Sequence, residues 1–148
     1  MIVSNSLFFI LKSKISAFFP KISISKSASN IHGITNSKVI NCIEYSEIHD
    51  EIIKIITEKT LLIYNAEFDL GMLYQTACIH NCDINDFERH DLFYNSFCIM
   101  EWYSEFYGDY NDYFDSYTWQ RLDRAAVQQR IDISDLKTHD AFGDCEIT

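Results

Sequence analysis

The sequence feature that most constrains the fold is the stretch Thr60–Ala77, TLLIYNAEFDLGMLYQTA. Thr60–Tyr64 is a short apolar, partly β-branched run, which is typical of a buried strand. Asn65 supplies a turn residue, and apolar residues then recur at helical spacing over Glu67–Ala77. The predicted order is strand, tight turn, helix, with Asp69 in the first turn of the helix, at the carboxyl end of the strand. In open α/β sheets, ligands bind in the crevice outside this end.

A carboxylate at the start of a helix has two explanations. It can simply complement the positive end of the helix dipole, which favours its ionised form. It can also be a ligand for a cation or part of a catalytic site. For Asp69, the surrounding residues favour the second explanation.

Three motifs in this chain resemble one family. Asn65–Asp69, NAEFD, resembles the second motif of the DEDDh 3′–5′ exonucleases, the DnaQ-like proofreading-subunit group of the ribonuclease-H-like fold. Ile31–Thr35, IHGIT, resembles the segment that precedes this motif, and His139–Asp144, HDAFGD, resembles the third motif. Cys98–Met100 and Tyr117–Leu122 are similar to connecting helices of bacterial and phage members.

The resemblance, over roughly Phe18–Thr148, implies an α/β fold. It is the ribonuclease-H-like three-layer arrangement, a mixed central sheet flanked by helices, in one domain over residues 1–148. With 148 residues, 47% of them hydrophobic, the chain is long enough for one core. The first family motif, D-x-E on the first strand, is absent, because no Asp or Glu precedes Glu44. We therefore expect a domain that is truncated at the N-terminus, without its first strand, and truncated also after Cys145–Thr148.

The resemblance also implies roles for individual residues. Asp69 and Asp144 would bind metal in a two-metal site for Mg²⁺ or Mn²⁺, which is incomplete here because the family uses four carboxylates. His139, which can titrate near neutral pH, would act as general base on a metal-bound water. The catalytic residues would be His139, Asp69 and Asp144, and the substrate-binding residues His32, Asn65 and Phe68.

The implied function is metal-dependent hydrolysis at the 3′ end of single-stranded DNA or RNA, with release of nucleoside monophosphates. A polymerase or repair complex is the implied partner. Without the first motif, we expect this chain by itself to be inactive or nearly so, and marginally stable. Two alternatives stay open: a non-catalytic nucleic-acid-binding or interaction module that keeps the fold, and an unrelated α/β domain.

Composition indicates the compartment in which the protein is expected, but it does not indicate the function. The net charge of −10 is uneven, because residues 1–43 hold five Lys and no acid. Five Cys without paired CxxC spacing indicate reduced thiols in the cytoplasm, and no signal peptide or membrane span is expected. Cys78, His80 and Cys82 form a weak alternative, a zinc site.

Further elements are expected from periodicity and turn residues. Ser46 is the expected N-cap of the longest helix, and Gly108 the expected end of another. The expected elements are a strand over 7–11, a helical turn over 27–30, helices over 44–59, 98–107 and 119–130, a polar loop over 81–89, a strand over 93–97, and an acidic, tyrosine-rich loop over 109–117.

Overall fold

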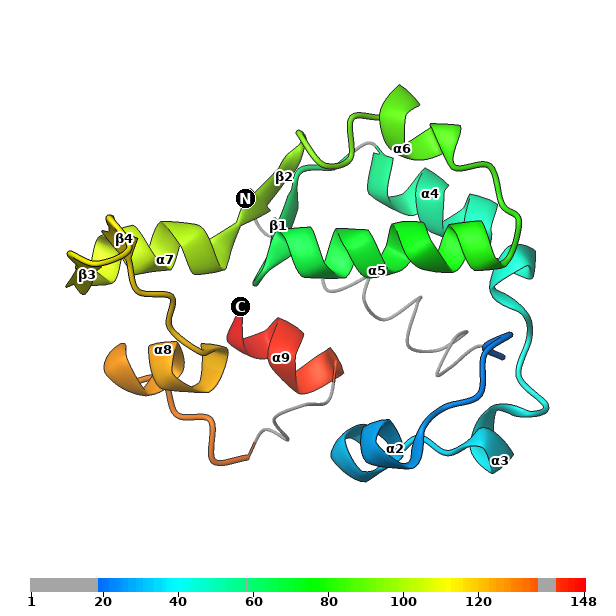
Figure 1. Ribbon diagram of the computed structural model, residues 1–148, viewed down its shortest axis with the longest axis horizontal. Helices are drawn as coiled ribbons and strands as arrows, with labels where there is room; N and C mark the ends of the chain where they lie inside the picture. The colour runs from blue at the N-terminus through cyan, green and yellow to red at the C-terminus, as the bar shows by residue number, and fades with distance from the viewer. Residues whose placement is uncertain (1–18, 58, 136–140) are drawn as a thin grey trace. The chain divides into compact units, whose positions relative to one another are not determined.

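The computed structural model describes residues 19–57, 59–135 and 141–148 (Figure 1). The strand expected over 7–11 lies outside these residues, as does His139. The chain divides into two compact units: unit 1 is Met1–Lys59 with Leu73–His90, and unit 2 is Thr60–Met72 with Asp91–Thr148. None of the described helices has the length and apolar run that a bilayer crossing requires.

The first helix of unit 1 in the described residues is α2, Lys26–His32, which extends the helical turn expected over 27–30. Ser25 caps it, because its hydroxyl oxygen accepts a hydrogen bond from the amide of Ala28 at 3.2 Å. Gly33 ends it in the left-handed region, at φ 71°, which glycine adopts at little cost. The short helix α3, Asn36–Val39, follows.

The helix expected over 44–59 is two elements, the 3₁₀ turn η1, Tyr45–Glu47, and helix α4, His49–Thr57. Ser46 is not the N-cap. Instead Glu44 and Glu47 form a reciprocal capping box, in which the Glu44 amide donates to the Glu47 carboxylate at 2.8 Å. Among the residues of this unit that the structure describes, the buried apolar ones are Val39, Tyr45, Ile48, Ile53, Ala77 and Phe87.

The stretch expected as a polar loop over 81–89 contains a helix, α6, Asn85–Arg89. That expectation was wrong because one apolar residue decides the conformation. Phe87 is 2% exposed and packs edge-to-face on Tyr74 at a centroid distance of 5.4 Å. Tyr74 lies on helix α5, Ala66–Ile79, so α6 packs on the second half of α5 within unit 1.

Unit 2 is built on two parallel strands, β1, Leu61–Ile63, and β2, Ser96–Cys98, paired with Leu61 opposite Ser96 (Figure 1). The first strand is where it was expected, and the second lies one to three residues later than the expected 93–97. The α/β class is confirmed. In the described residues the sheets are two separate two-stranded ones, so the larger mixed central sheet and its three layers stay a prediction.

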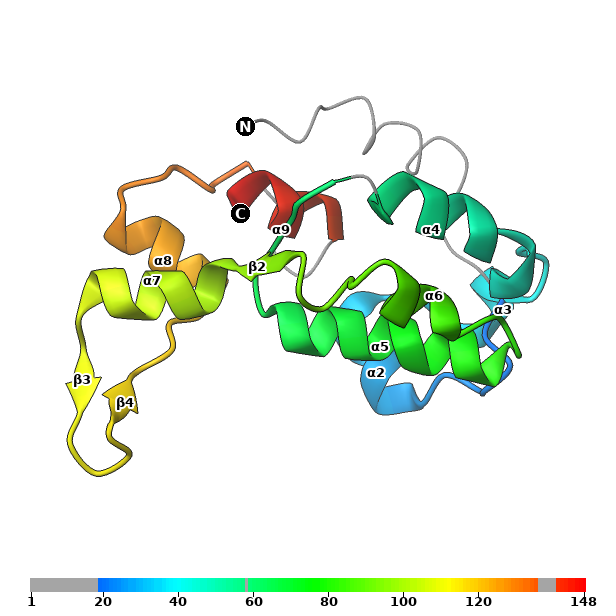
Figure 2. The same ribbon diagram turned by 90° about the horizontal axis from the view of Figure 1, so that it is seen from above.

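Helix α7, Ile99–Tyr107, follows β2 directly and ends at Gly108, whose φ is 78°, as the sequence predicted. The expected loop over 109–117 is instead a hairpin, β3, Tyr110–Asn111, paired antiparallel with β4, Ser116–Tyr117. Figure 2 shows the hairpin extending away from the end of α7, with β3 leading out and β4 leading back.

Helices α8, Leu122–Gln128, and α9, Ala141–Ile147, contact each other and complete unit 2. The helix expected over 119–130 is therefore shorter at both ends. Trp119 was expected to point inward but precedes α8 and is 63% exposed, whereas Ala126 is 2% exposed, as expected.

Candidate functional site

The turn between β1 and α5 places Asp69. Asn65 adopts a φ of 73°, a left-handed conformation that Asn tolerates better than most residues. Its carbonyl oxygen accepts hydrogen bonds from the amides of Phe68 (3.1 Å) and Asp69 (3.3 Å), which starts the helix. Asp69 therefore lies in the first turn of α5, after the carboxyl end of β1, which confirms the order of strand, turn and helix.

The residue before this turn is anchored within unit 2. The hydroxyl of Tyr64 donates a hydrogen bond to the carbonyl oxygen of Gln120 at 2.7 Å. Burial is the main reason that the pKa of Tyr64 is raised to about 12, so the phenol stays protonated and keeps donating at neutral pH. This bond ties the end of β1 to the segment that leads into α8.

Asp144 belongs to the last helix of unit 2. It lies in the first turn of α9, and its carbonyl oxygen accepts hydrogen bonds from the amide (3.1 Å) and the hydroxyl (2.9 Å) of Thr148. The helix contacts α8, so its position follows from the packing of α8 on its neighbours.

Asp69 and Asp144, which are distant in sequence, interact electrostatically. Partial desolvation raises the pKa of Asp69, and the negative charge of Asp144 raises it further, although the Asp69 side chain keeps access to solvent. Two carboxylates at the first turns of two helices thus repel each other. A cation between them would remove this repulsion.

Cys145 experiences the same charges. Partial burial raises the pKa of its thiol, and the charges of Asp144 and Asp69 raise it further. Since both carboxylates act on one neighbouring sulfur, they share one region of unit 2. A thiol held protonated in this way is a poor nucleophile, so Cys145 is not a catalytic candidate.

The raised pKa of Asp69 predicts a pH dependence. The folded chain holds the Asp69 proton more tightly than the unfolded chain does, so the stability that this proton provides is present below the unfolded pKa, about 3.9, and is lost as pH rises through the folded pKa. In EDTA, Asp69→Asn should therefore be more stable than wild type at pH 7, with the difference shrinking toward pH 4. Urea unfolding at several pH values measures this.

Glu67→Gln is the matched control, because it removes an exposed carboxylate from the same helical turn. It loses the same interaction with the helix dipole but not the repulsion by Asp144. If Asp69→Asn is no more stable than Glu67→Gln at pH 7, the repulsion between Asp69 and Asp144 is not significant.

The other predicted site residues are divided among the parts of the chain. Asn65 is half-buried, and Phe68, which is 60% exposed, lies on α5 one residue before Asp69. His32 is the last residue of α2 and belongs to unit 1. His139 lies outside the described residues, so its predicted role is untested.

An apolar cavity also lies in unit 2, between α7, α8 and the end of α9. Its volume, about 200 Å³, is below the roughly 300–1,000 Å³ of typical ligand pockets. Neither Asp69 nor Asp144 lines it. It is therefore better explained as loose packing next to the candidate site than as the site itself.

One group of side chains was not predicted from the sequence. Within the described residues, His49, Asp50 and Asp86 are the group whose donor atoms lie close enough together to hold a metal ion, within 4.8 Å of one another. The apolar periodicity of 44–59 explains its isoleucines but not His49, and nothing in the sequence relates His49 to Asp86. The zinc alternative at Cys78, His80 and Cys82 gains no support, since these residues form no such group.

Comparison with known proteins agrees with the resemblance. The chain is 33% identical over 129 residues to a protein named uncharacterized exonuclease CP81 of Escherichia phage 186. The matched region covers 87% of this chain and 65% of that protein. It is also 33% identical over 81 residues to the DNA polymerase III subunit epsilon of Buchnera aphidicola subsp. Acyrthosiphon pisum, covering 55% of this chain and 31% of that protein. A second epsilon subunit, from Buchnera aphidicola subsp. Baizongia pistaciae, is 33% identical over 64 residues, 43% of this chain and 26% of that protein.

The chain thus spans less than two thirds of the length of each of these relatives. No protein-family model matches it, and no solved structure is detectably similar to it. The similarity to a named exonuclease and to polymerase III epsilon subunits supports an exonuclease family for this chain.

Proposed function

We propose that the chain carries part of a DEDDh-type 3′–5′ exonuclease site, in which Asp69 and Asp144 bind Mg²⁺ or Mn²⁺ at the 3′ end of a single-stranded nucleic acid. The observation that carries the proposal is the electrostatic interaction of these two carboxyl groups, which adds to partial desolvation in raising the pKa of Asp69. The sequence similarity to an exonuclease and to epsilon subunits supports the same reaction class and a polymerase or repair complex as partner.

The residues present suit a divalent ion. Carboxylate oxygens are the ligands that Mg²⁺ and Mn²⁺ favour. The negative charges of Asp69 and Asp144 repel each other, and a divalent ion would offset this repulsion. When bound, the ions would supply an activated water and stabilise the leaving 3′ oxygen. His139 would take the proton from that water.

Phe68 and Asn65 would receive the terminal nucleotide. Phe68 lies in the same helical turn as Asp69, and its ring is 60% exposed, so it can stack on a base. The half-buried Asn65 forms the turn that sets the direction of this helix. For His32, which belongs to unit 1, a substrate-binding role stays what the resemblance implies.

Catalysis by this chain alone should be very slow. The site needs clustered carboxylates to hold two ions, and by the resemblance two of four are present, because no acid precedes Glu44. We therefore propose that the chain binds 3′ ends in a metal-dependent way but releases mononucleotides at a negligible rate.

The test measures binding and cleavage together. A single-stranded oligonucleotide, DNA or RNA, is labelled and titrated with the purified chain in Mn²⁺ or in EDTA, and binding is followed by fluorescence anisotropy. Binding should require Mn²⁺ and weaken by at least about tenfold in Asp144→Asn and in Phe68→Ala. Glu146→Gln, an exposed acid on the same helix as Asp144, is the matched control and should bind like wild type.

The same reactions, resolved on a gel, report cleavage. Stepwise shortening that Asp144→Ala abolishes would show an active nuclease and refute the proposed inactivity. Binding that EDTA leaves unchanged would refute the metal site and favour the non-catalytic binding module. Absence of binding in both conditions would refute the proposed function.

A further inference from the structure

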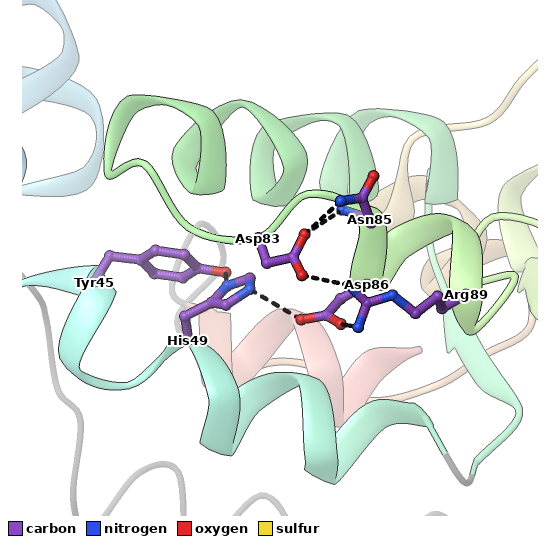
Figure 3. A network of polar contacts seen from close by, with 6 residues as sticks. All are labelled: Tyr45, His49, Asp83, Asn85, Asp86 and Arg89. Atoms are coloured by element: carbon purple, nitrogen blue, oxygen red, sulfur yellow. Dashed lines mark hydrogen bonds and ion pairs between the residues drawn. The ribbon is translucent and has the colours of Figure 1, made fainter.

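A second group of polar side chains lies in unit 1, between α4 and α6 (Figure 3). We call His49, Asp50 and Asp86 the α4–α6 cluster. His49 is 2% exposed, and its Nε2 atom makes no hydrogen bond. The nearest acidic atom is Oδ2 of Asp86, at 3.6 Å, a separation too long for a hydrogen bond. A buried ring nitrogen left in this state is costly and calls for an explanation.

The other ring nitrogen of His49 has a partner. Nδ1 lies 3.1 Å from the hydroxyl oxygen of Tyr45, which is itself 0% exposed. When Nδ1 carries the proton and donates to this oxygen, the lone pair of Nε2 faces the Asp86 carboxylate. The buried ring nitrogen of His49 and the partly exposed Asp86 carboxylate are then two electron-pair donors that face each other, and a cation between them is the arrangement that stabilises both.

The distances suit a metal ion better than a direct contact. Two ligands of a tetrahedral ion with bond lengths of about 2.1 Å lie roughly 3.4 Å apart, which is close to the 3.6 Å between His49 Nε2 and Asp86 Oδ2. Asp50 offers a third donor, and all three donor atoms lie within 4.8 Å of one another. Asp50 is exposed, which leaves one side of the cluster accessible to ions and water.

The carboxylate of Asp86 is already oriented by its neighbours. Arg89 donates from Nη1 to Oδ1 of Asp86 at 3.0 Å, which leaves Oδ2 facing His49. Arg89 also pairs with Asp83, whose carboxylate accepts hydrogen bonds from the amide and side chain of Asn85 at 3.0 and 2.8 Å. Tyr45 on one side and Arg89 on the other thus hold two donor groups in place, as outer-sphere residues do at metal sites (Figure 3).

From this geometry we propose that the α4–α6 cluster binds one divalent transition-metal ion through Nε2 of His49 and the carboxylates of Asp50 and Asp86. One imidazole and two carboxylates favour Mn²⁺ or Zn²⁺ over Mg²⁺ and Ca²⁺, which prefer oxygen ligands alone. The ion would link α4 to α6 and fasten the second segment of unit 1 to the first. This site is separate from Asp69 and Asp144, which belong to unit 2.

The test counts bound Mn²⁺ by electron paramagnetic resonance, in which the signal of free Mn²⁺ disappears on binding. Mn²⁺ is the probe because the thiols of this chain favour softer ions. The full chain carries Asp69→Asn and Asp144→Asn, so that the site of the proposed function cannot contribute. We expect one Mn²⁺ per chain, and an affinity at least about tenfold lower after Asp50→Asn or His49→Gln.

Glu88→Gln is the matched control, since it neutralises an exposed acid on α6. It should bind Mn²⁺ with unchanged affinity. Asp50→Asn keeps the test valid if His49→Gln fails to fold, because Asp50 is exposed. No bound Mn²⁺ at millimolar concentration, or equal affinity in Asp50→Asn and Glu88→Gln, would overturn the proposal. If the unmodified chain binds no more Mn²⁺ than the chain that carries Asp69→Asn and Asp144→Asn, this result counts against the proposed function alone.

Discussion

Replacing Tyr103 by alanine should lower the free energy of unfolding of the chain by about 3–5 kcal/mol, the range for a large buried aromatic side chain. Tyr103 lies on α7 and is 5% exposed. Its ring packs against Phe106 and Tyr107, and its hydroxyl donates to Gln128 Oε1 (2.9 Å) and accepts from Gln129 Nε2 (3.0 Å). The alanine variant loses both the ring packing and the bonds that connect α7 to the end of α8.

This change should also reach the candidate site. Because α8 contacts α9, and α9 carries Asp144, loosening α8 should displace Asp144 from Asp69 and weaken Mn²⁺ binding. Tyr103→Phe keeps the ring and should cost only about 1–2 kcal/mol. Trp102→Ala, on the same helix but 50% exposed, should cost less than Tyr103→Ala. Urea unfolding followed by circular dichroism measures all three, and equal losses for Tyr103→Ala and Tyr103→Phe would show that the ring does not hold α8.

Mn²⁺ should stabilise the folded chain through Asp69 and Asp144, and Asp144→Asn should abolish this gain. A ligand that binds only the folded state adds about 2.7 kcal/mol of stability at a concentration 100 times its dissociation constant. The ion also removes the repulsion that raises the pKa of Asp69, so the gain should be larger at pH 7 than at pH 5, where protons compete for the carboxylates. Thermal unfolding with and without Mn²⁺ measures the effect.

Every protein in this experiment also carries Asp50→Asn, which removes a proposed ligand of the α4–α6 cluster. Glu146→Gln is the control, because it changes the charge of α9 without changing the Asp144 carboxylate. A gain that persists in Asp144→Asn would place the ion elsewhere and remove the metal from the proposed function. A gain lost in both Asp144→Asn and Glu146→Gln would indicate a general effect of charge on α9.

Local rules predicted the elements in which one signal dominates. Helix α7 combines an apolar stripe with Gly108 at its end, and the structure ends it at that glycine. The turn after β1 was equally clear, because Asn65 is one of the few residues other than glycine that readily adopt its φ of 73°. The prediction that Asp69 lies in the first turn of the following helix depended only on this order and was confirmed.

Local rules failed where a partner distant in sequence decides. The polar run over 81–89 forms a helix because Phe87 packs on Tyr74, and the strand β2 begins at Ser96 because Leu61–Ile63 pairs with it there. Ser46 was the expected cap, but the reciprocal bonds of Glu44 and Glu47 satisfy more of the free amides at this helix start.

The sequence by itself determined the α/β class, the strand–turn–helix that carries Asp69, and the motifs that resemble an exonuclease. Only the tertiary structure decided which charges interact. Asp69 and Asp144 affect each other because the first half of α5 and all of α9 belong to unit 2, and His49 faces Asp86 because α4 and α6 belong to unit 1. The physical reason is that electrostatic energy depends on distance in space and on burial, and neither can be obtained from the spacing of residues along the chain.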